Sequence, residues 1–263
     1  MLSPVPVLLY HSISTNPPAW IAPFAVTPAT FAAHLDAVVA SGRQPLTVSQ
    51  YVDGLRGASE LPDRSVLITA DDGFADFVEN ALPALMARTL PSTLYVATGS
   101  LADTDRETVL PGAPMLRGAD LPGLEAAGVE IGAHSHTHRH LDLLPDREVS
   151  AELARSREIL SKALGHPVRS FAFPHGYWKP GLLAQVAAAG HDSAAGVGNA
   201  LSTARDHPLA LSRLMVRADT PLSTIVRWLD GEGRSSPRHR AAALGWRRYR
   251  HLKQLTQRKS WLG

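Results

Sequence analysis

The sequence predicts an α/β protein built on parallel strands, either a βα barrel or a doubly wound sheet. Short apolar runs alternate with stretches of helical periodicity along most of the chain, a pattern typical of parallel strands joined by crossover helices. Polar clusters follow three of these runs. Because the chemistry of such folds sits at the carboxyl ends of the strands, these clusters are candidates for one shared site.

The predicted elements follow from the period of the apolar residues. Strands are expected at residues 5–10, 65–70, 93–97, 129–133, 169–173 and 211–216. Helices are expected after the cap Thr27 and the first-turn Pro28, and at residues 77–89, 117–128, 146–165, 180–190 and 221–230. For the longest helix, Asp146 is the expected cap and Gly165 the expected end.

The composition excludes several classes of protein. The chain has 263 residues, of which 44% are hydrophobic and 19% charged, so it can bury a sizeable core. It has no cysteine, which excludes disulfides and thiolate chemistry, whereas its 12 histidines leave imidazole and carboxylate metal sites open. No apolar run reaches the ~18 residues of a membrane span. The start does not resemble a signal peptide, so a cytoplasmic location is expected.

The charge is unevenly distributed along the chain. Residues 231–263 carry nine basic residues against one acid, whereas the rest carries 17 basic and 23 acidic residues. We therefore expect a domain over residues 1–230 and, over 231–263, a linker with a basic, partly amphipathic tail. Such a tail could hold an anionic membrane surface or an acidic polymer, cover the acidic body, or simply be solvated. No nucleic-acid motif accompanies it.

The stretch LITADDGFAD, residues 67–76, places Asp71 and Asp72 side by side where an apolar run ends. Neighbours in a strand point to opposite faces, so both carboxylates can reach one site only if the backbone turns there. Gly73 gives that freedom. An ordinary Asp-Asp-Gly turn is the alternative.

The stretch GAHSHTHRHL, residues 132–141, contains four histidines at alternate positions. An i,i+4 pair in a helical turn or an i,i+2 pair in a strand could share a metal ion, and a surface histidine tract is the alternative. Two histidines with one carboxylate satisfy a catalytic zinc site, which keeps an open position for water. One aspartate of the pair could then bind the metal while the other acts as a base.

Three motifs in order make the sequence resemble the polysaccharide deacetylases (carbohydrate esterase family 4). TADDGFAD is similar to their T-F-D-D-G motif, and GAHSHTHRHL to their H-[ST]-x-x-H metal motif. FAFPHGYW, residues 171–178, is similar to their third motif, F-R-P-P-Y-G or F-A-Y-P-Y-G. The resemblance covers residues 5 to about 217 and implies a distorted (β/α)7-8 barrel.

The resemblance also implies roles for individual residues. Asp71 would be the general base, and Asp72, His134 and His138 the metal ligands. The backbone N–H of His175, which stands where tyrosine is usual, would help to form the oxyanion hole. His136 and His140 have no counterpart among the family's ligands and are expected to be exposed or to lie beside the ligands.

Two departures from the family pattern lead to further candidates. Ala172 stands where many members carry an arginine that holds the base, and Arg213 is the candidate replacement, with a surface arginine as the alternative. Ala70 stands where phenylalanine is usual, which suggests a packing change.

The family's C-terminal L-x-H motif is missing, but VPVLLYHSI at the N-terminus is similar to the V-L-x-Y-H-x-I start of the circularly permuted poly-β-1,6-N-acetylglucosamine deacetylase branch. His11 would then be the general acid, or alternatively a structural histidine at a strand end.

Together these features predict a metal-dependent hydrolase that removes N-acetyl groups from an N-acetylglucosamine-type glycan or its precursor. Zn²⁺ is the expected ion, and Co²⁺, Ni²⁺ or Mn²⁺ also fit such ligands. Tyr177 and Trp178 could stack on sugar rings or pack the barrel rim. The alternatives are a deformylase or O-acetyl esterase with the same site, a sugar-binding module without turnover, and a membrane-docked assembly protein that acts through the tail.

Overall fold

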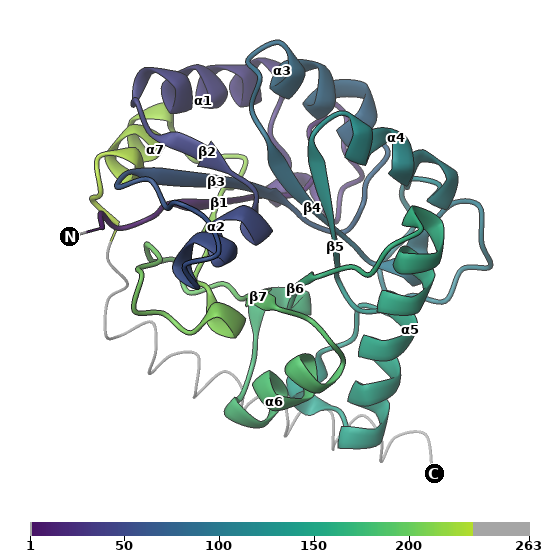
Figure 1. Ribbon diagram of the computed structural model, residues 1–263. Helices are drawn as coiled ribbons and strands as arrows, with labels where there is room; N and C mark the ends of the chain where they lie inside the picture. The colour runs from purple at the N-terminus through teal and green to yellow at the C-terminus, as the bar shows by residue number, and fades with distance from the viewer. Residues whose placement is uncertain (1, 234–263) are drawn as a thin grey trace.

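A curved sheet of parallel strands forms the centre of the computed structural model, which describes residues 2–233 (Figure 1). The strand order is β7-β6-β5-β4-β3-β1-β8, with β2 paired to β3 outside this path, and every pairing is parallel. The strands are β1 (Val7–Tyr10), β2 (Gln44–Leu46), β3 (Ser65–Ala70), β4 (Ser92–Val96), β5 (Val129–Ala133), β6 (Ser170–Ala172), β7 (Ser193–Ala195) and β8 (Leu214–Met215). The predicted distorted (β/α) barrel is confirmed.

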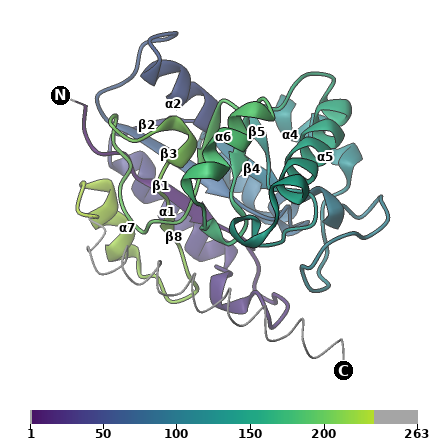
Figure 2. The same ribbon diagram turned by 90° about the horizontal axis from the view of Figure 1, so that it is seen from below.

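The helices follow one another around the convex side of the sheet, except α2, which lies on the concave side (Figures 1 and 2). They are α1 (Pro28–Ala40), α2 (Val48–Leu55), α3 (Leu82–Met86), α4 (Leu121–Ala126), α5 (Asp146–Leu164), α6 (Pro180–Ala188) and α7 (Leu222–Leu229). A π-helical turn, Phe77–Ala81, leads into α3. None of the described helices has the length and apolar character needed to cross a bilayer.

The alternation of side chains along the strands divides the core in two and decides where the site lies. In β3, Val66, Ile68 and Ala70 belong to the outer core under the helices, whereas Leu67 belongs to the inner core, where α2 packs. Thr69 and Asp71 continue the inner series because side chains alternate along a strand. The first aspartate of the pair is therefore directed into the concave side of the sheet, at its carboxyl edge.

Three short elements differ from the sequence prediction. Strands β2 and β7 have three residues each and lack an apolar run, since β2 is partly exposed and β7 reads Ser-Ala-Ala. Helix α2 has only eight residues, yet it carries a sequence signal, a capping box between Thr47 and Gln50. The two strands are too short for periodicity to reveal them, whereas α2 is as long as the predicted helix α7 and was not predicted despite its capping box.

The predicted cap of the longest helix is wrong. Pro145 occupies the cap position of α5, and Asp146 is its first helical residue. The Asp146 carboxylate accepts a hydrogen bond from Gln185 at 3.0 Å and does not cap the helix. Its charge in the first turn still favours the helix dipole. The predicted end is confirmed, because Gly165 closes the helix in the left-handed conformation.

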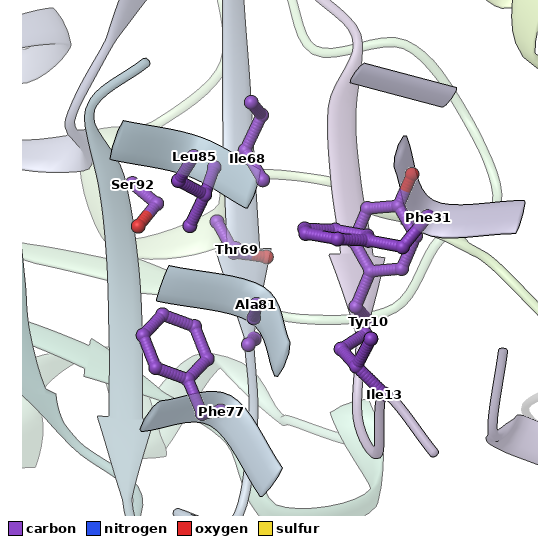
Figure 3. A pocket seen from close by; sticks show the side chains of 10 residues that line it. Tyr10, Ile13, Phe31, Ile68, Thr69, Phe77, Ala81, Leu85 and Ser92 are labelled. Atoms are coloured by element: carbon purple, nitrogen blue, oxygen red, sulfur yellow. The ribbon is translucent and has the colours of Figure 1, made fainter. Parts of the chain in front are cut away.

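A small cavity lies in the outer core beneath the carboxyl ends of β1 and β3 (Figure 3). Tyr10 and Phe31 lie on one side of it, with ring centroids 4.9 Å apart, and Phe77 and Leu85 lie on the other. Ala70, where the family resemblance would place phenylalanine, is one of the residues that line it. The cavity is lined mainly by apolar side chains and is separate from the polar side chains described below.

The predicted domain boundary lies at the edge of what the structure describes. The predicted linker begins at residue 231, and the basic tail lies outside the described residues.

Candidate active site

Asp71 and Asp72 share one site because the backbone reverses directly after β3. Asp71 still donates its N–H to Tyr10 at 3.0 Å, as the next rung of the ladder between β3 and β1. Asp72 and Gly73 then take positive φ angles of 75° and 86°, a conformation that costs a residue with a side chain free energy. As a result, Asp71 Oδ2 and Asp72 Oδ1 lie 3.6 Å and 3.5 Å from the same atom, His134 Nε2.

His134 and His138 come from the loop that follows β5. The N–H of His134 continues the pairing with β4 by donating to the carbonyl oxygen of Val96 at 3.0 Å, and the residue is 1% exposed. His138 has a φ of 60°, and its N–H donates to Ser135 Oγ at 3.1 Å. The serine of the H-S-x-x-H motif thus closes a tight turn that brings His138 Nε2 to 3.3 Å from His134 Nε2.

The ligand set predicted from the sequence converges on one point. One ligand atom from each of Asp72, His134 and His138 lies within 4.8 Å of the other two, and all three residues are buried. His134 Nδ1 lies 2.8 Å from the carbonyl oxygen of Ala172. A proton on Nδ1 satisfies that contact and leaves the Nε2 lone pair for a metal. Two imidazoles and one carboxylate are a donor set suited to a divalent ion such as zinc.

Arg213 holds the carboxylate that the ligand set does not use. Its Nη1 and Nη2 donate to Asp71 Oδ1 and Oδ2 at 2.6 Å and 2.8 Å, a bidentate ion pair. The arginine is fully buried, and its guanidinium lies 5.4 Å from the centroid of the Tyr95 ring. The surface alternative for Arg213 is therefore wrong. Many family members hold the base aspartate with an arginine at the position of Ala172. In this chain the Arg213 guanidinium contacts Asp71 as expected of a replacement for that arginine.

The charges of the site favour two ionised carboxylates beside neutral imidazole. Burial would raise the pKa of Asp71, but Arg213 and then His134 hold it below its ordinary value. Burial would likewise raise the pKa of Asp72, but His138 holds it below its ordinary value. Burial lowers the pKa of His134 to about 4, so its ring is neutral near pH 7. Neutral imidazole and carboxylate are the forms that bind metals.

His11 lies at the carboxyl end of β1, the strand next to β3. Its Nδ1 is buried without a hydrogen-bond partner among the described residues, and its ring lies 5.6 Å from the Phe24 ring. Burial lowers the pKa of His11, against the opposing effect of Asp72 and Asp71. The strand order thus brings the N-terminal Leu9-Tyr10-His11 motif to the same edge of the sheet as Asp71.

His175 reaches the site on the loop after β6. It has a φ of 59°, and its ring lies 4.6 Å from the His138 ring and stacks on His140 at 3.7 Å. Gly176 follows with a φ of 74°, and a Cβ there would meet Val197 at 2.3 Å. The Pro-His-Gly sequence therefore permits a sharp turn that carries His175 beside a predicted metal ligand.

The two aromatic residues after this turn differ in their surroundings. The Trp178 ring stacks on Phe173 with centroids 6.4 Å apart and remains 36% exposed, so it packs the rim and also shows a surface to solvent. Gly196 makes room for the indole, because a Cβ there would lie 2.8 Å from it. The Tyr177 ring lies 6.2 Å from His140, beside the histidine cluster.

The loop between His134 and His138 has partners that the motifs did not reveal. His136 is buried, with Nδ1 2.8 Å from Thr98 Oγ1 and Nε2 3.3 Å from Glu107. Glu152 of α5 accepts hydrogen bonds from the N–H groups of His136 and Thr137. A sequence signal for Glu152 existed, because it is an acid on a helix face shared with Val149, Leu153, Ser156 and Leu160.

Comparison with known proteins places the chain in a family. Residues 58–194 match the family model for polysaccharide deacetylases, which is just over half of the chain, and the chain therefore belongs to that family. The resemblance seen in the motifs is confirmed.

Two curated relatives match parts of the chain. The chain is 24% identical over 179 residues to YxkH of Bacillus subtilis strain 168, which is described as a polysaccharide deacetylase. The match covers 68% of this chain and 59% of that relative. A 64-residue stretch is 34% identical to the poly-β-1,6-N-acetyl-D-glucosamine N-deacetylase of Escherichia coli K12, covering 24% of this chain and 9% of that protein.

Solved structures share the fold. The Streptococcus pyogenes deacetylase PplD, solved in complex with acetate, superposes with a TM-score of 0.75 at 21% identity, over 86% of this chain and 98% of that one. IcaB from Ammonifex degensii superposes with a TM-score of 0.74 at 24% identity, over 86% of this chain and 97% of that one. At these identities the likeness shows the fold.

Proposed function

We propose that this chain is a metal-dependent hydrolase that removes N-acetyl groups from an amino sugar, as part of an N-acetylglucosamine-type glycan or its precursor. One observation carries the proposal: two adjacent carboxylates are held for different tasks. Asp72 Oδ1 lies 3.1 Å from His138 Nε2 within the candidate ligand set, whereas both oxygens of Asp71 are held by Arg213. Family membership and the activity for which the E. coli relative is named support the choice of substrate.

Asp72, His134 and His138 would hold the ion, with Zn²⁺ as the first choice and Co²⁺, Ni²⁺ or Mn²⁺ as alternatives. When bound there, a divalent ion supplies a Lewis acid that polarises a carbonyl and acidifies water. The tautomer of His134 is set by the Ala172 carbonyl oxygen at 2.8 Å, which fixes the ring before any ion arrives.

The remaining residues would move protons and hold charge. Asp71 takes a proton from the attacking water, and Arg213 keeps that carboxylate oriented and ionised. The water oxygen adds to the carbonyl carbon, and the His175 N–H donates to the oxyanion that develops. His11 gives a proton to the departing nitrogen as the C–N bond breaks, which releases acetate and a free amine. Tyr177 and Trp178 would contact the sugar ring.

The direct test is acetate release from N-acetylglucosamine oligomers by the zinc-loaded protein. Asp71→Asn and His11→Ala should each lower the rate about 10²-fold or more, because each removes a proton-transfer group. His166→Ala, which changes an exposed histidine paired with Glu125, should leave the rate unchanged. All three variants should keep the wild-type circular dichroism spectrum.

The outcomes separate the alternatives. Loss of activity in Asp71→Asn alone would remove His11 from the role of acid and keep the deacetylase. A metal-loaded wild type that releases no acetate would contradict the proposal. Release of formate, or release from O-acetylated sugars alone, would then favour a deformylase or an esterase with the same site. Binding of oligomers without any turnover would favour a sugar-binding module.

The division into a catalytic unit, residues 1–230, and a linker with a basic tail, residues 231–263, also remains a proposal. The tail's nine basic residues against one acid support attachment to an anionic membrane surface or an acidic polymer. The cytoplasmic location expected from the sequence stays a prediction.

A further inference from the structure

Glu152 is a buried acid that contacts the loop between the two histidine ligands. It lies on α5 and is 4% exposed. Its Oε2 accepts hydrogen bonds from the backbone N–H groups of His136 at 2.9 Å and Thr137 at 2.8 Å. Its Oε1 accepts one from the Thr137 hydroxyl at 2.5 Å and a longer one from Arg139 at 3.4 Å. Both carboxylate oxygens are therefore used by residues that lie between His134 and His138 or directly after them.

The loop needs such a partner because its backbone is unfavourable by itself. Ser135 and His138 both have a φ of 60°, although neither is glycine. Each left-handed residue of this kind costs of order 1–3 kcal/mol and persists only where the surroundings enforce it. Consecutive N–H groups beside such residues form a concave nest that suits an anion. The Glu152 carboxylate occupies this position, and its bonds are charge-assisted.

The rest of the loop's backbone is held from the opposite side. The carbonyl groups of Ser135, His136 and Thr137 accept hydrogen bonds from Thr98, Gly99 and Val109. In those bonds the carbonyl oxygens of the loop are the acceptors, whereas the N–H groups of His136 and Thr137 donate to Glu152. Without Glu152, the N–H groups of the buried His136 and the half-buried Thr137 would lose their partners, and a buried donor left unsatisfied costs about 1–3 kcal/mol. The loop could relieve that cost by moving, which would displace His138 relative to His134.

We propose that Glu152 is a positioning residue for the metal centre, one that holds the loop from His134 to His138 in the shape that brings both imidazoles to one ion. This rests on the proposed function only in taking Asp72, His134 and His138 as the ligands. Partners of this kind around a metal site typically change metal affinity 10–100-fold when they are removed.

The experiment measures metal binding directly. The apparent dissociation constant for Zn²⁺ is obtained by competition with a chromophoric chelator, and the visible absorption spectrum of the Co²⁺-loaded protein reports the geometry of the ligands. Glu152→Ala should raise the dissociation constant 10–100-fold and alter the Co²⁺ spectrum. Glu152→Gln should raise it less, about threefold or more, because the amide oxygen can accept both backbone N–H groups while its nitrogen faces the Thr137 hydroxyl.

Glu148→Ala is the matched control. Glu148 lies one turn earlier on α5 and accepts from Arg139 at 2.8 Å, but its carboxylate is exposed and makes no contact with the loop's N–H groups. This variant should bind Zn²⁺ as the wild type does. If Glu152→Ala fails to fold, Glu152→Gln carries the test. A folded Glu152→Ala, or in its absence Glu152→Gln, with wild-type affinity and Co²⁺ spectrum would overturn the inference.

Acetate release is measured on the same samples to keep the two proposals apart. A wild type that binds Zn²⁺ but releases no acetate contradicts the deacetylase and leaves the affinity comparison valid. A wild type that binds neither Zn²⁺ nor Co²⁺ overturns both.

Discussion

Arg213 and Asp71 form a buried ion pair, so each charge depends on the other. Replacing Arg213 with alanine leaves the Asp71 carboxylate buried without a counter-charge, which typically destabilises a protein by about 3–5 kcal/mol. Arg213→Lys keeps the charge but loses the bidentate ion pair with Asp71. It should therefore destabilise the protein less than Arg213→Ala does and still lower acetate release. Urea unfolding of the two variants measures the loss.

Arg56→Ala serves as the control for this pair. The Arg56 ion pair with Asp192 is about 40% exposed on both sides, and exposed pairs contribute about 0–1 kcal/mol. An Arg213→Ala variant as stable as Arg56→Ala would show that the buried pair does not stabilise the fold.

The site residues differ in how far the sequence could reveal them. The two aspartates and the two histidines proposed as ligands stand in short motifs whose residue types and spacing indicate a metal site. Arg213 could be predicted only indirectly, because Ala172 stands where the motif usually has an arginine and another arginine was therefore expected near Asp71. Glu152 was not predicted: its place on the buried face of α5 is a weak signal, and the sequence of residues 134–138 does not show which backbone N–H groups need an acceptor.

Two glycines that lie in or next to helices provide a clean comparison of backbone strain. Gly165 ends α5 at a φ of 78°, whereas Gly123 lies inside α4 without a positive φ. A Cβ would meet no atom within 4 Å at either position. Gly165→Ala should therefore destabilise the protein by about 1–2 kcal/mol through the left-handed conformation alone. Gly123→Ala should be neutral or stabilising by up to about 1 kcal/mol.

Thermal unfolding of the two alanine variants measures this difference. Equal melting temperatures would mean that the α5 terminus relaxes at no cost, contrary to the expected strain.

At the scale of elements, prediction succeeded where a segment buries a periodic face or a continuous apolar run. Helix α5 has 19 residues with a buried stripe, and β3 has six consecutive buried residues. Strand β7 has only three small residues, whose burial comes from neighbours distant in sequence. The same limit applies to α2, because its place inside the curved sheet depends on contacts that a local pattern does not encode.

His191 links the stability of the whole molecule to pH. It is 3% exposed, so its ring is almost completely shielded from water. Burial lowers its pKa from an ordinary 6.5 to about 4. The neutral ring therefore contributes stability that is fully present above pH 6.5 and is lost as the pH falls toward 4. The difference between the two pKa values corresponds to about 3 kcal/mol in the free energy of unfolding.

The stability difference between wild type and His191→Gln isolates this contribution. The advantage of the wild type in free energy of unfolding should shrink by about 2–3 kcal/mol between pH 7 and pH 4.5. His166 is a control whose stability contribution should change with pH in the opposite direction. Its hydrogen bond to Glu125 raises its pKa, and its contribution to stability is therefore lost as the pH rises. A pH-independent difference between wild type and His191→Gln would contradict the prediction.

The position of β1 has a consequence for the order of assembly during synthesis. This strand pairs on one side with β3 and on the other with β8, whose residues lie about 200 positions later. At about 5–20 residues per second, a ribosome adds that stretch in roughly 10–40 seconds. Throughout this interval the nascent chain holds His11 without Arg213, and one edge of β1 stays open. The proposed site therefore cannot be complete until Arg213 has been added to the chain, and until β8 follows it, β1 lacks one of its two partner strands.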